Sequence, residues 1–381
     1  MKRFLWIFTF WTINTTHAQS QIIKPPHLNY EMDTLTKVKI LGSLDTLFLQ
    51  IKNNKLDAKL IGRGETEFNT LKSFSELEAH KKDSIEDFYK KQLINIYPIS
   101  DTDYWISLAY IGQKNKETPI LRCIINLIAS NIGDKIVFSL PTQYLTKTWK
   151  SEVVGNITYF FRDKLNKERA KKFDEKNTII AHKLGLEPEK FDFYMCYNYQ
   201  EVLQLLGYEY DLEANGKVRD GYGVDGNTIF AVMNNEDFSH DVFHYYSDKF
   251  RKQAGNGIVE EGVAYSWGNA YYTQSNGEMI EQKELIQSLK VYLKANPKVT
   301  PLDLFTQKPK IFNHIAPEIS VKSTITSLIC DEVERKKGIE GIKTLIKCGS
   351  GEDNFFKAVN ELIGLNKTNF NVELSRFIQQ Y

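Results

Sequence analysis

The sequence has 381 residues, with 49 Lys and Arg against 48 Asp and Glu, and its formal net charge is +1. A chain so close to neutral lacks the basic excess by which nucleic-acid-binding proteins hold phosphates, so we expect no nucleic-acid partner. Its length exceeds what one hydrophobic core commonly supports, which favours two domains.

Residues 1–18 have the order of a secretory signal peptide. Lys2 and Arg3 precede an apolar run from Phe4 to Trp11, and Thr16-His17-Ala18 offers small residues for cleavage. We therefore expect cleavage near Ala18 and export to the periplasm or the exterior. The apolar run is too short to span a bilayer, and no later stretch is long and uncharged enough to do so. No membrane span is expected.

Four cysteines, too few and too scattered for a disulfide framework, occur along the chain. Cys330 and Cys348 lie in neighbouring predicted helices, and an oxidising compartment would permit a bridge between them. Buried thiols are the alternative interpretation.

The segment 19–148 is predicted to form a small α+β domain. Apolar residues at spacings near three and four predict helices over Ser43–Ile61 and Phe74–Ile96. Runs rich in Ile, Val, Tyr and Phe then predict strands over Tyr104–Ile111, Ile120–Ser130 and Lys135–Leu140. Helices followed by a meander of strands indicate a curved antiparallel sheet covered by helices on one face.

The segment 149–381 is predicted to form a second domain, with a small sheet followed by a mostly helical half. Its first part alternates between strand and helix patterns, in the order strand Ile157–Arg162, helix Lys164–Leu184, strand Phe191–Cys196, helix Gln200–Leu206 and strand Thr228–Met233. From Phe238 onward the pattern is almost wholly helical. The whole chain is thus expected to belong to the α+β class.

Two histidines stand one helical turn apart in the predicted helix Phe238–Gln253. His240 and His244 leave the same face of that helix, as two ligands of one tetrahedral zinc ion do. Turn residues end the helix, and a second predicted helix, Ile258–Tyr272, can return beside it. That helix can present Glu260 or Glu261 as a third ligand and leave the fourth position for water.

These motifs resemble those of the gluzincin zinc peptidases, in the peptidase MA-like group. The segment His240-Asp241-Val242-Phe243-His244 resembles the H-E-x-x-H helix of that family, with Asp in place of Glu. Glu260-Glu261-Gly262-Val263-Ala264-Tyr265 resembles the stretch that carries the third ligand, which assigns that role to Glu261. The likeness extends over Asn156–Tyr381 and includes a strand before the zinc helix and a helical tail after it.

The resemblance implies a zinc-dependent peptidase. Zn²⁺ would be held by His240, His244 and Glu261, and Asp241 would act as general base toward zinc-bound water. An extended peptide would pair beside Thr228–Met233 by strand addition. Because Asp is one methylene shorter than Glu, the base would be displaced by about 1 Å, which can cost on the order of a hundredfold in rate.

Two supporting roles remain open at this stage. Tyr265, one turn after Glu261, could orient the ligands or simply pack in the helix. The group that stabilises the oxyanion could be His314, on a predicted loop, or else Tyr271 or Tyr272. The alternative function is a catalytically impaired descendant that binds a peptide or an envelope partner, with zinc structural or absent.

Overall fold

The computed structural model describes residues 22–62, 65–78, 88–113, 118–214, 223–232, 235–252, 254–273 and 279–381. The expected signal peptide lies outside these residues. The chain divides into two compact units, of which the first holds Met1–Gly62, Leu71–Ser139 and Tyr210–Glu213 and the second holds Arg63–Thr70, Leu140–Glu209 and Ala214–Tyr381. The predicted boundary at 148/149 and this boundary at 139/140 lie on either side of helix α4 (Thr142–Thr146). Sheets and helices in both units confirm the α+β class.

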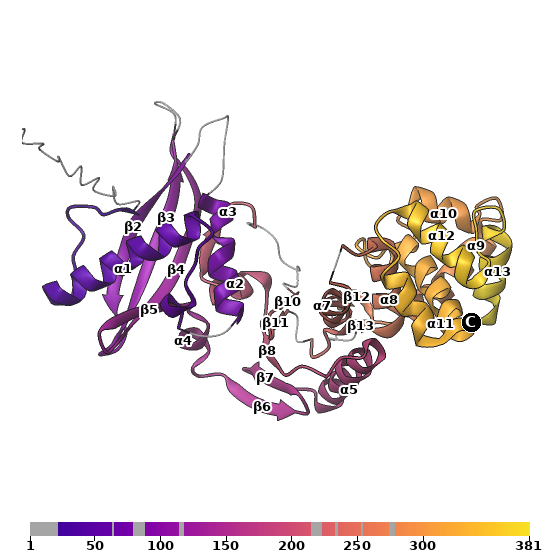
Figure 1. Cartoon of the computed structure of the whole chain (residues 1–381), viewed down its shortest axis with the longest axis horizontal. Coiled ribbons are helices and arrows are strands. Elements are labelled where there is room, and N and C mark those ends of the chain that lie inside the picture. Colours follow the sequence, from indigo (N-terminus) through magenta and orange to yellow (C-terminus); the bar gives the residue numbers. More distant parts are fainter. Residues whose placement is uncertain are drawn as a thin grey trace, which may run out of the picture. The chain divides into compact units, whose positions relative to one another are not determined.

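The first unit is built on a sheet with the order β1-β2-β3-β4-β5, to which β9 adds beside β4. Helix α1 (Thr34–Lys52) lies across this sheet and buries an apolar stripe that includes Leu44 and Phe48 (Figure 1). The strands are β1 (Ile22–Ile23), β2 (Tyr89–Pro98), β3 (Asp103–Gly112), β4 (Ile120–Ile132), β5 (Lys135–Ser139) and β9 (Tyr208–Asp211). The antiparallel meander of β3, β4 and β5 confirms the three predicted strands, and β2 pairs with β3 as a strand that the sequence did not predict.

The helix predicted over Phe74–Ile96 is wrong. Residues 79–87 lie outside the described part, α3 covers only Ser75–Glu78, and β2 begins at Tyr89. The pairing of β2 with β3 shifts in register between Leu93 and Asn95, so buried residues of β2 are three positions apart there instead of two. Apolar residues spaced in this way resemble those of a helix. The other predicted helix is displaced: Asp33 caps α1 at its start, and α1 ends at Lys52. A short helix η1 (Ala58–Leu60) and helix α2 (Glu65–Ser73) follow.

The second unit contains a five-stranded sheet with the order β10-β11-β8-β7-β6. Its three inner strands β7 (Ile157–Phe161), β8 (Phe191–Met195) and β11 (Thr228–Ala231) are parallel, and the outer strands β6 (Lys150–Val154) and β10 (Gly223–Asp225) are antiparallel to them. Helix α5 (Lys167–Leu184) connects β7 to β8. The ring of Phe173 from α5 packs against Phe193 of β8, and both side chains are fully buried.

The strand beside which a peptide was expected to pair, Thr228–Met233, corresponds to β11, which is an inner strand of this sheet. β11 pairs with β8 on one side and with β10 on the other, so Gly223–Asp225 forms the edge among the described strands. Met233, the last residue of the predicted strand, lies outside the described residues. The sequence did not reveal β10 because only three residues of it form the strand.

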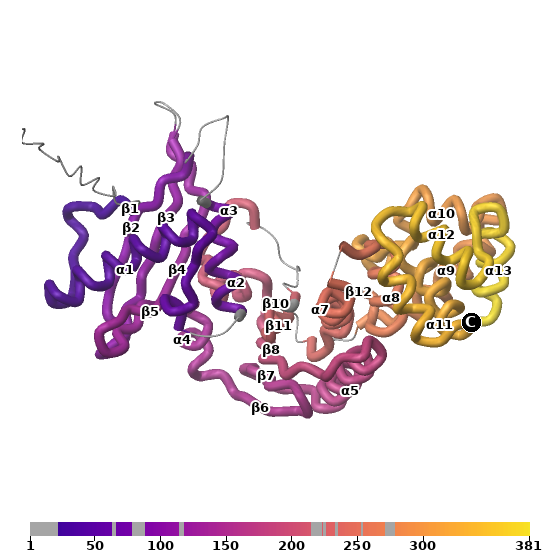
Figure 2. The backbone as a smooth tube through the Cα atoms, viewed as in Figure 1, coloured from indigo at the N-terminus to yellow at the C-terminus, as the bar shows by residue number. Residues whose placement is uncertain are grey.

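The rest of the second unit is helical apart from the hairpin of β12 (Ala270–Thr273) and β13 (Met279–Ile280). Helix α8 ends at Trp267 rather than at Tyr272, since Gly268 leaves helical geometry and the chain continues into β12. Figure 2 shows the later helices gathered into one cluster. The helices are α6 (Tyr199–Leu205), α7 (Ser239–Arg251), α8 (Gly257–Trp267), α9 (Gln282–Ala295), α10 (Pro301–Gln307), α11 (Val321–Ile346), α12 (Glu352–Ile363) and α13 (Phe370–Gln380).

Two further expectations concern the whole chain. None of the helices in the described part is both long and apolar enough to cross a membrane. The four cysteines, all of which are described, form no disulfide with one another, so Cys330 and Cys348 are not bridged.

Candidate metal centre

Helix α7 brings its two histidines together as the sequence predicts. His240 and His244 are one turn apart, and their Nε2 atoms lie 3.2 Å from each other. The rings meet edge to face, with centroids 4.9 Å apart. Two imidazole nitrogens therefore point to one place beside α7.

Helix α8 adds a carboxylate at the same place. The Oε2 atom of Glu261 lies 3.7 Å from Nε2 of His240, and its Oε1 atom lies 3.5 Å from Nε2 of His244. One ligand atom of each of the three residues lies within 4.8 Å of the others. A tetrahedral ion with bonds of about 2.0–2.2 Å separates its ligand atoms by about 3.3–3.6 Å. The three side chains can thus hold one metal ion without large movement.

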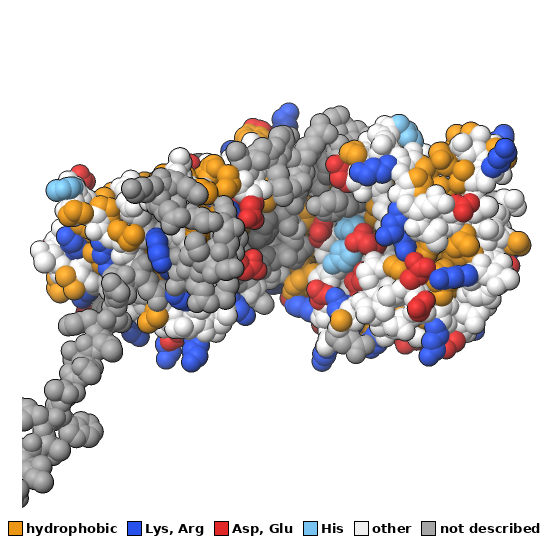
Figure 3. Space-filling model, turned by 90° about the horizontal axis from the view of Figure 1, so that it is seen from above, with side chains coloured by type: hydrophobic (Ala, Val, Ile, Leu, Met, Phe, Trp, Pro, Cys, Tyr) orange, Lys and Arg blue, Asp and Glu red, His pale blue; other side chains and the backbone are white. Residues whose placement is uncertain are grey.

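The centre is closed on one side and open on the other. The side chain of His240 is 6% exposed, whereas those of His244 and Glu261 are 30% and 45% exposed. In Figure 3, histidine side chains in pale blue reach the surface beside acidic side chains in red. Three protein ligands with an open side are the arrangement of catalytic rather than structural metal sites.

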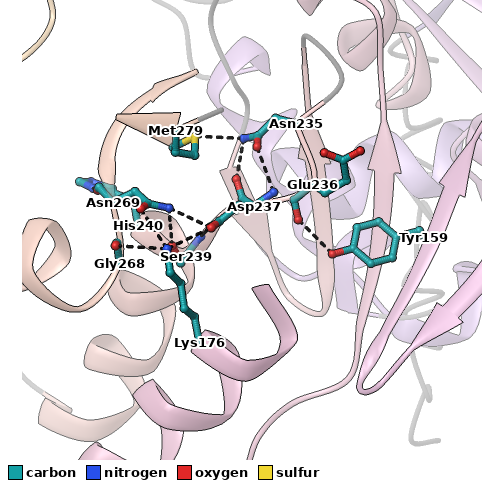
Figure 4. A network of polar contacts seen from close by, with 10 residues as sticks. All are labelled: Tyr159, Lys176, Asn235, Glu236, Asp237, Ser239, His240, Gly268, Asn269 and Met279. Atoms are coloured by element: carbon teal, nitrogen blue, oxygen red, sulfur yellow. Dashed lines mark hydrogen bonds and ion pairs between the residues drawn. The ribbon is translucent and has the colours of Figure 1, made fainter. Parts of the chain in front are cut away.

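A buried polar network holds His240. Its Nδ1 atom lies 3.0 Å from the carbonyl oxygen of Asn269, and because a carbonyl can only accept, Nδ1 carries the proton and Nε2 is left for a metal. The Asn269 amide donates to Asp237 and to Ser239, and Lys176 donates to both Asp237 and the Asn269 side chain (Figure 4). The network therefore fixes Asn269, which directly precedes β12 and whose carbonyl sets the orientation of the His240 ring.

Glu260 performs the corresponding role for His244. Its Oε2 atom lies 3.4 Å from Nδ1 of His244, while its Oε1 atom accepts hydrogen bonds from Ser247 and Arg251. Glu260 is 6% exposed. Sequence reasoning offered Glu260 only as a rival ligand and missed this contact. A signal existed, since His244, Ser247 and Arg251 form a polar stripe at helical spacing along one face of α7.

The charges of the centre shift the pKa values of its groups. Burial, aided by the charge of His244, lowers the pKa of His240 to about 4. Burial would also lower the pKa of His244, but hydrogen bonds to Glu260 and Glu261 outweigh it and raise that pKa to about 10. Burial opposes ionisation of Glu261, yet its contact with His244 keeps its pKa below the ordinary value. One proton is thus held between His244 and the two carboxylates.

Asp241 follows His240 on the first turn of α7 and is partly buried. Burial raises its pKa to about 7, and the charge of His244 opposes the rise. Its Oδ1 atom lies 3.7 Å from the position that a Cβ atom would occupy on Gly223 of β10. The carboxylate of Asp241 therefore extends from α7 toward β10.

The remaining candidates are placed differently. The ring of Tyr265 stands edge-on to His240, 5.8 Å between centroids, and its hydroxyl accepts from the amide of Ser320. His314 is exposed and contacts Ser288 of α9, and no contact within the described residues joins it to the triad. Tyr271 and Tyr272 lie in β12, and their side chains fall outside the described part.

The chain was compared with protein-family models, with curated proteins and with solved structures, and none of them matches it. The resemblance to gluzincins therefore rests on the motifs alone.

Proposed function

We propose that this chain is an exported, zinc-dependent hydrolase of the gluzincin kind, acting on peptides. The observation that supports the proposal is the convergence of His240, His244 and Glu261. The two Nε2 atoms lie 3.2 Å apart, and the two carboxylate oxygens of Glu261 lie 3.5 Å and 3.7 Å from them. Two imidazoles and one carboxylate are a common ligand set of catalytic zinc. Zinc, when bound, would supply a Lewis acid and lower the pKa of water.

The protein's own groups would divide the other tasks. Asn269 and Glu260 hold the two imidazoles so that each directs its Nε2 atom to the centre. Asp241 would accept a proton from the attacking water and pass it to the leaving amine, because a carboxylate with a pKa of about 7 can do both near neutral pH. His314, the candidate for stabilising the oxyanion, contacts Ser288 and makes no described contact with the triad, so it is assigned no part in the proposed reaction.

The peptide would lie along the sheet edge in extended form. β10 is the outer strand and its backbone approaches Asp241, so strand addition would take place at Gly223–Asp225 rather than at β11. A peptide paired there would pass beside the ligand helix.

The alternative function, a binding protein with an impaired centre, has one observation in its favour. The carboxylate at position 241 is one methylene shorter than that of the resembled motif, and no described contact brings His314 to the centre as an oxyanion partner. Such a protein would hold the peptide at the same edge without cleaving it.

The deciding experiment measures metal content and cleavage together. Purified chain should retain about one zinc per molecule after dialysis, and His244→Ala should lose it while His314→Gln should not. Cleavage of a mixed peptide library should stop with a chelator and return with zinc. One zinc without cleavage of any peptide would support the binding protein, and a chain that takes up no zinc at neutral pH would refute the site.

A further inference from the structure

A small cavity of about 240 Å³ lies directly beside the candidate metal centre. Glu261 forms part of its wall, so the cavity and the centre share a residue. The other side chains that matter here come from the end of α10 and the beginning of α11, and they are Lys308, Ser320, Lys322, Ser323 and Thr326.

The cavity has an excess of positive charge. Lys308 is exposed and forms no ion pair with any described residue. Lys322 lies 3.0 Å from Glu352, but Glu352 also pairs with Lys367 at 3.3 Å, so one carboxylate is shared by two ammonium groups. Glu261 directs its carboxylate toward the two histidines of the triad, at 3.7 Å from His240 and 3.5 Å from His244.

A hydroxyl group adds a hydrogen-bond donor to the same wall. The Oγ atom of Ser320 accepts from the amide of Ser323, which leaves its own hydrogen available to another acceptor. The amide of Ser320 donates to Tyr265, whose ring stands against His240. The wall of the cavity is therefore fixed relative to the metal ligands.

We propose that this cavity receives a carboxylate of the peptide substrate, next to the scissile bond. The proposal rests on the function proposed above and specifies its substrate class. Two ammonium groups and a hydroxyl suit a carboxylate, since charge-assisted hydrogen bonds are the stronger ones. The volume is below the roughly 300–1,000 Å³ of sites for whole small ligands, which fits one chain end or one side chain. The carboxylate is either the C-terminus of a peptide or an Asp or Glu side chain.

The test uses the full zinc-loaded chain and short peptides that carry an N-terminal hydroxamate to bind the metal. One pair differs only in a C-terminal carboxylate or carboxamide, and a second, amidated pair differs only in Asp or Asn. Titration calorimetry should show that, in one pair, the peptide with the carboxylate binds about tenfold more tightly than its partner. The pair that shows this difference tells whether the cavity binds a C-terminal or a side-chain carboxylate.

Substitutions of the cavity lysines test whether the preference for the carboxylate peptide arises in this cavity. Lys308→Gln and Lys322→Gln should each reduce it severalfold, whereas Lys310→Gln, an exposed lysine that does not line the cavity, should leave it unchanged. Lys322 also lies over the ring of Phe305, so Lys322→Arg, which keeps the charge, should retain the preference and separates loss of charge from loss of packing.

The outcomes distinguish the two proposals. A chain that binds no zinc would overturn the proposed function and this one together. A chain that binds zinc and both members of each pair equally would overturn the carboxylate site alone. A preference that survives in both Lys308→Gln and Lys322→Gln would likewise overturn it, because the carboxylate would then bind elsewhere.

Discussion

The carboxylate of Glu260 lies 3.4 Å from Nδ1 of His244, on the side of the ring away from the two neighbouring ligands. Glu260→Gln should weaken zinc binding about tenfold or more, the scale measured for groups that orient metal-bound histidines. Competition with a fluorescent chelator measures the affinity. Glu318→Gln, at an exposed position, is the matched control. Equal affinities of the two variants would remove Glu260 from the centre.

Asp241 provides a test of catalysis that leaves the ligands in place. Asp241→Asn should abolish peptide cleavage while one zinc stays bound, because the amide cannot accept the proton. Asp241→Glu should preserve or raise the rate, because it restores the reach of the resembled motif. The longer side chain of Glu can be accommodated on this side, because the neighbouring residue of β10 is Gly223, which has no side chain. A rate unaffected by Asp241→Asn would contradict the assigned role.

Asn269 tests the network around His240. Its side chain is 3% exposed and donates to Asp237 and Ser239. Asn269→Ala should lower the free energy of unfolding by about 1–3 kcal/mol, because it removes two buried hydrogen bonds, although Lys176 still donates to Asp237. The carbonyl that receives Nδ1 of His240 is backbone and remains, so zinc affinity should fall less than in Glu260→Gln. Denaturant unfolding and chelator competition on the same preparation compare the two effects.

Gly262 allows α8 and α11 to approach closely. A Cβ atom at this position would lie 2.5 Å from Cγ2 and 2.9 Å from Cβ of Thr326. Gly262→Ala should therefore destabilise the fold by about 1–3 kcal/mol, as overpacked core positions do. Adding Thr326→Ser removes the nearest atom and should recover part of the loss in thermal unfolding. Full stability of Gly262→Ala alone would show that the two helices can separate without cost.

The lowered pKa of Glu332 in α11 predicts how the free energy of unfolding depends on pH. A hydrogen bond from Arg335 is the main reason that its pKa is lowered to about 2, with burial opposing and Lys336 and Arg376 assisting. Because the folded pKa lies below the ordinary 4.5, this contribution is full above about pH 4.5 and is lost as the pH falls toward 2.

Glu332→Gln should accordingly cost about 1 kcal/mol near neutral pH, the upper range for ion pairs with exposed partners, and the difference should vanish near pH 2. Urea unfolding at a series of pH values measures it. The exposed Glu340→Gln is the control. A difference that grows on acidification would have the wrong sign for a lowered pKa.

The local pattern of residues along the sequence predicts some of these features and misses others. His240 and His244 were predicted because one helical turn fixes their relation. Glu261 followed from its motif. The role of Glu260 depends on how α8 lies against α7, and β2 was mistaken for a helix because pairing with β3 overrides spacing along the chain. Tertiary contacts of this kind leave little trace in one sequence.

The neighbours Glu260 and Glu261 show how much depends on the rotation of a single helix. One contacts the back of His244 and the other faces the open side, so a turn of α8 by one residue would exchange them. Asn256 caps α8 and donates hydrogen bonds to the carbonyls of Gly349 and Gly351, while Gly262 packs closely against Thr326. Which of the two carboxylates faces the proposed metal position is therefore set by helix packing and by hydrogen bonds of Asn256 to a loop. Substitutions at those distant contacts should alter the affinity of the proposed site for a metal while His240, His244 and Glu261 stay unchanged.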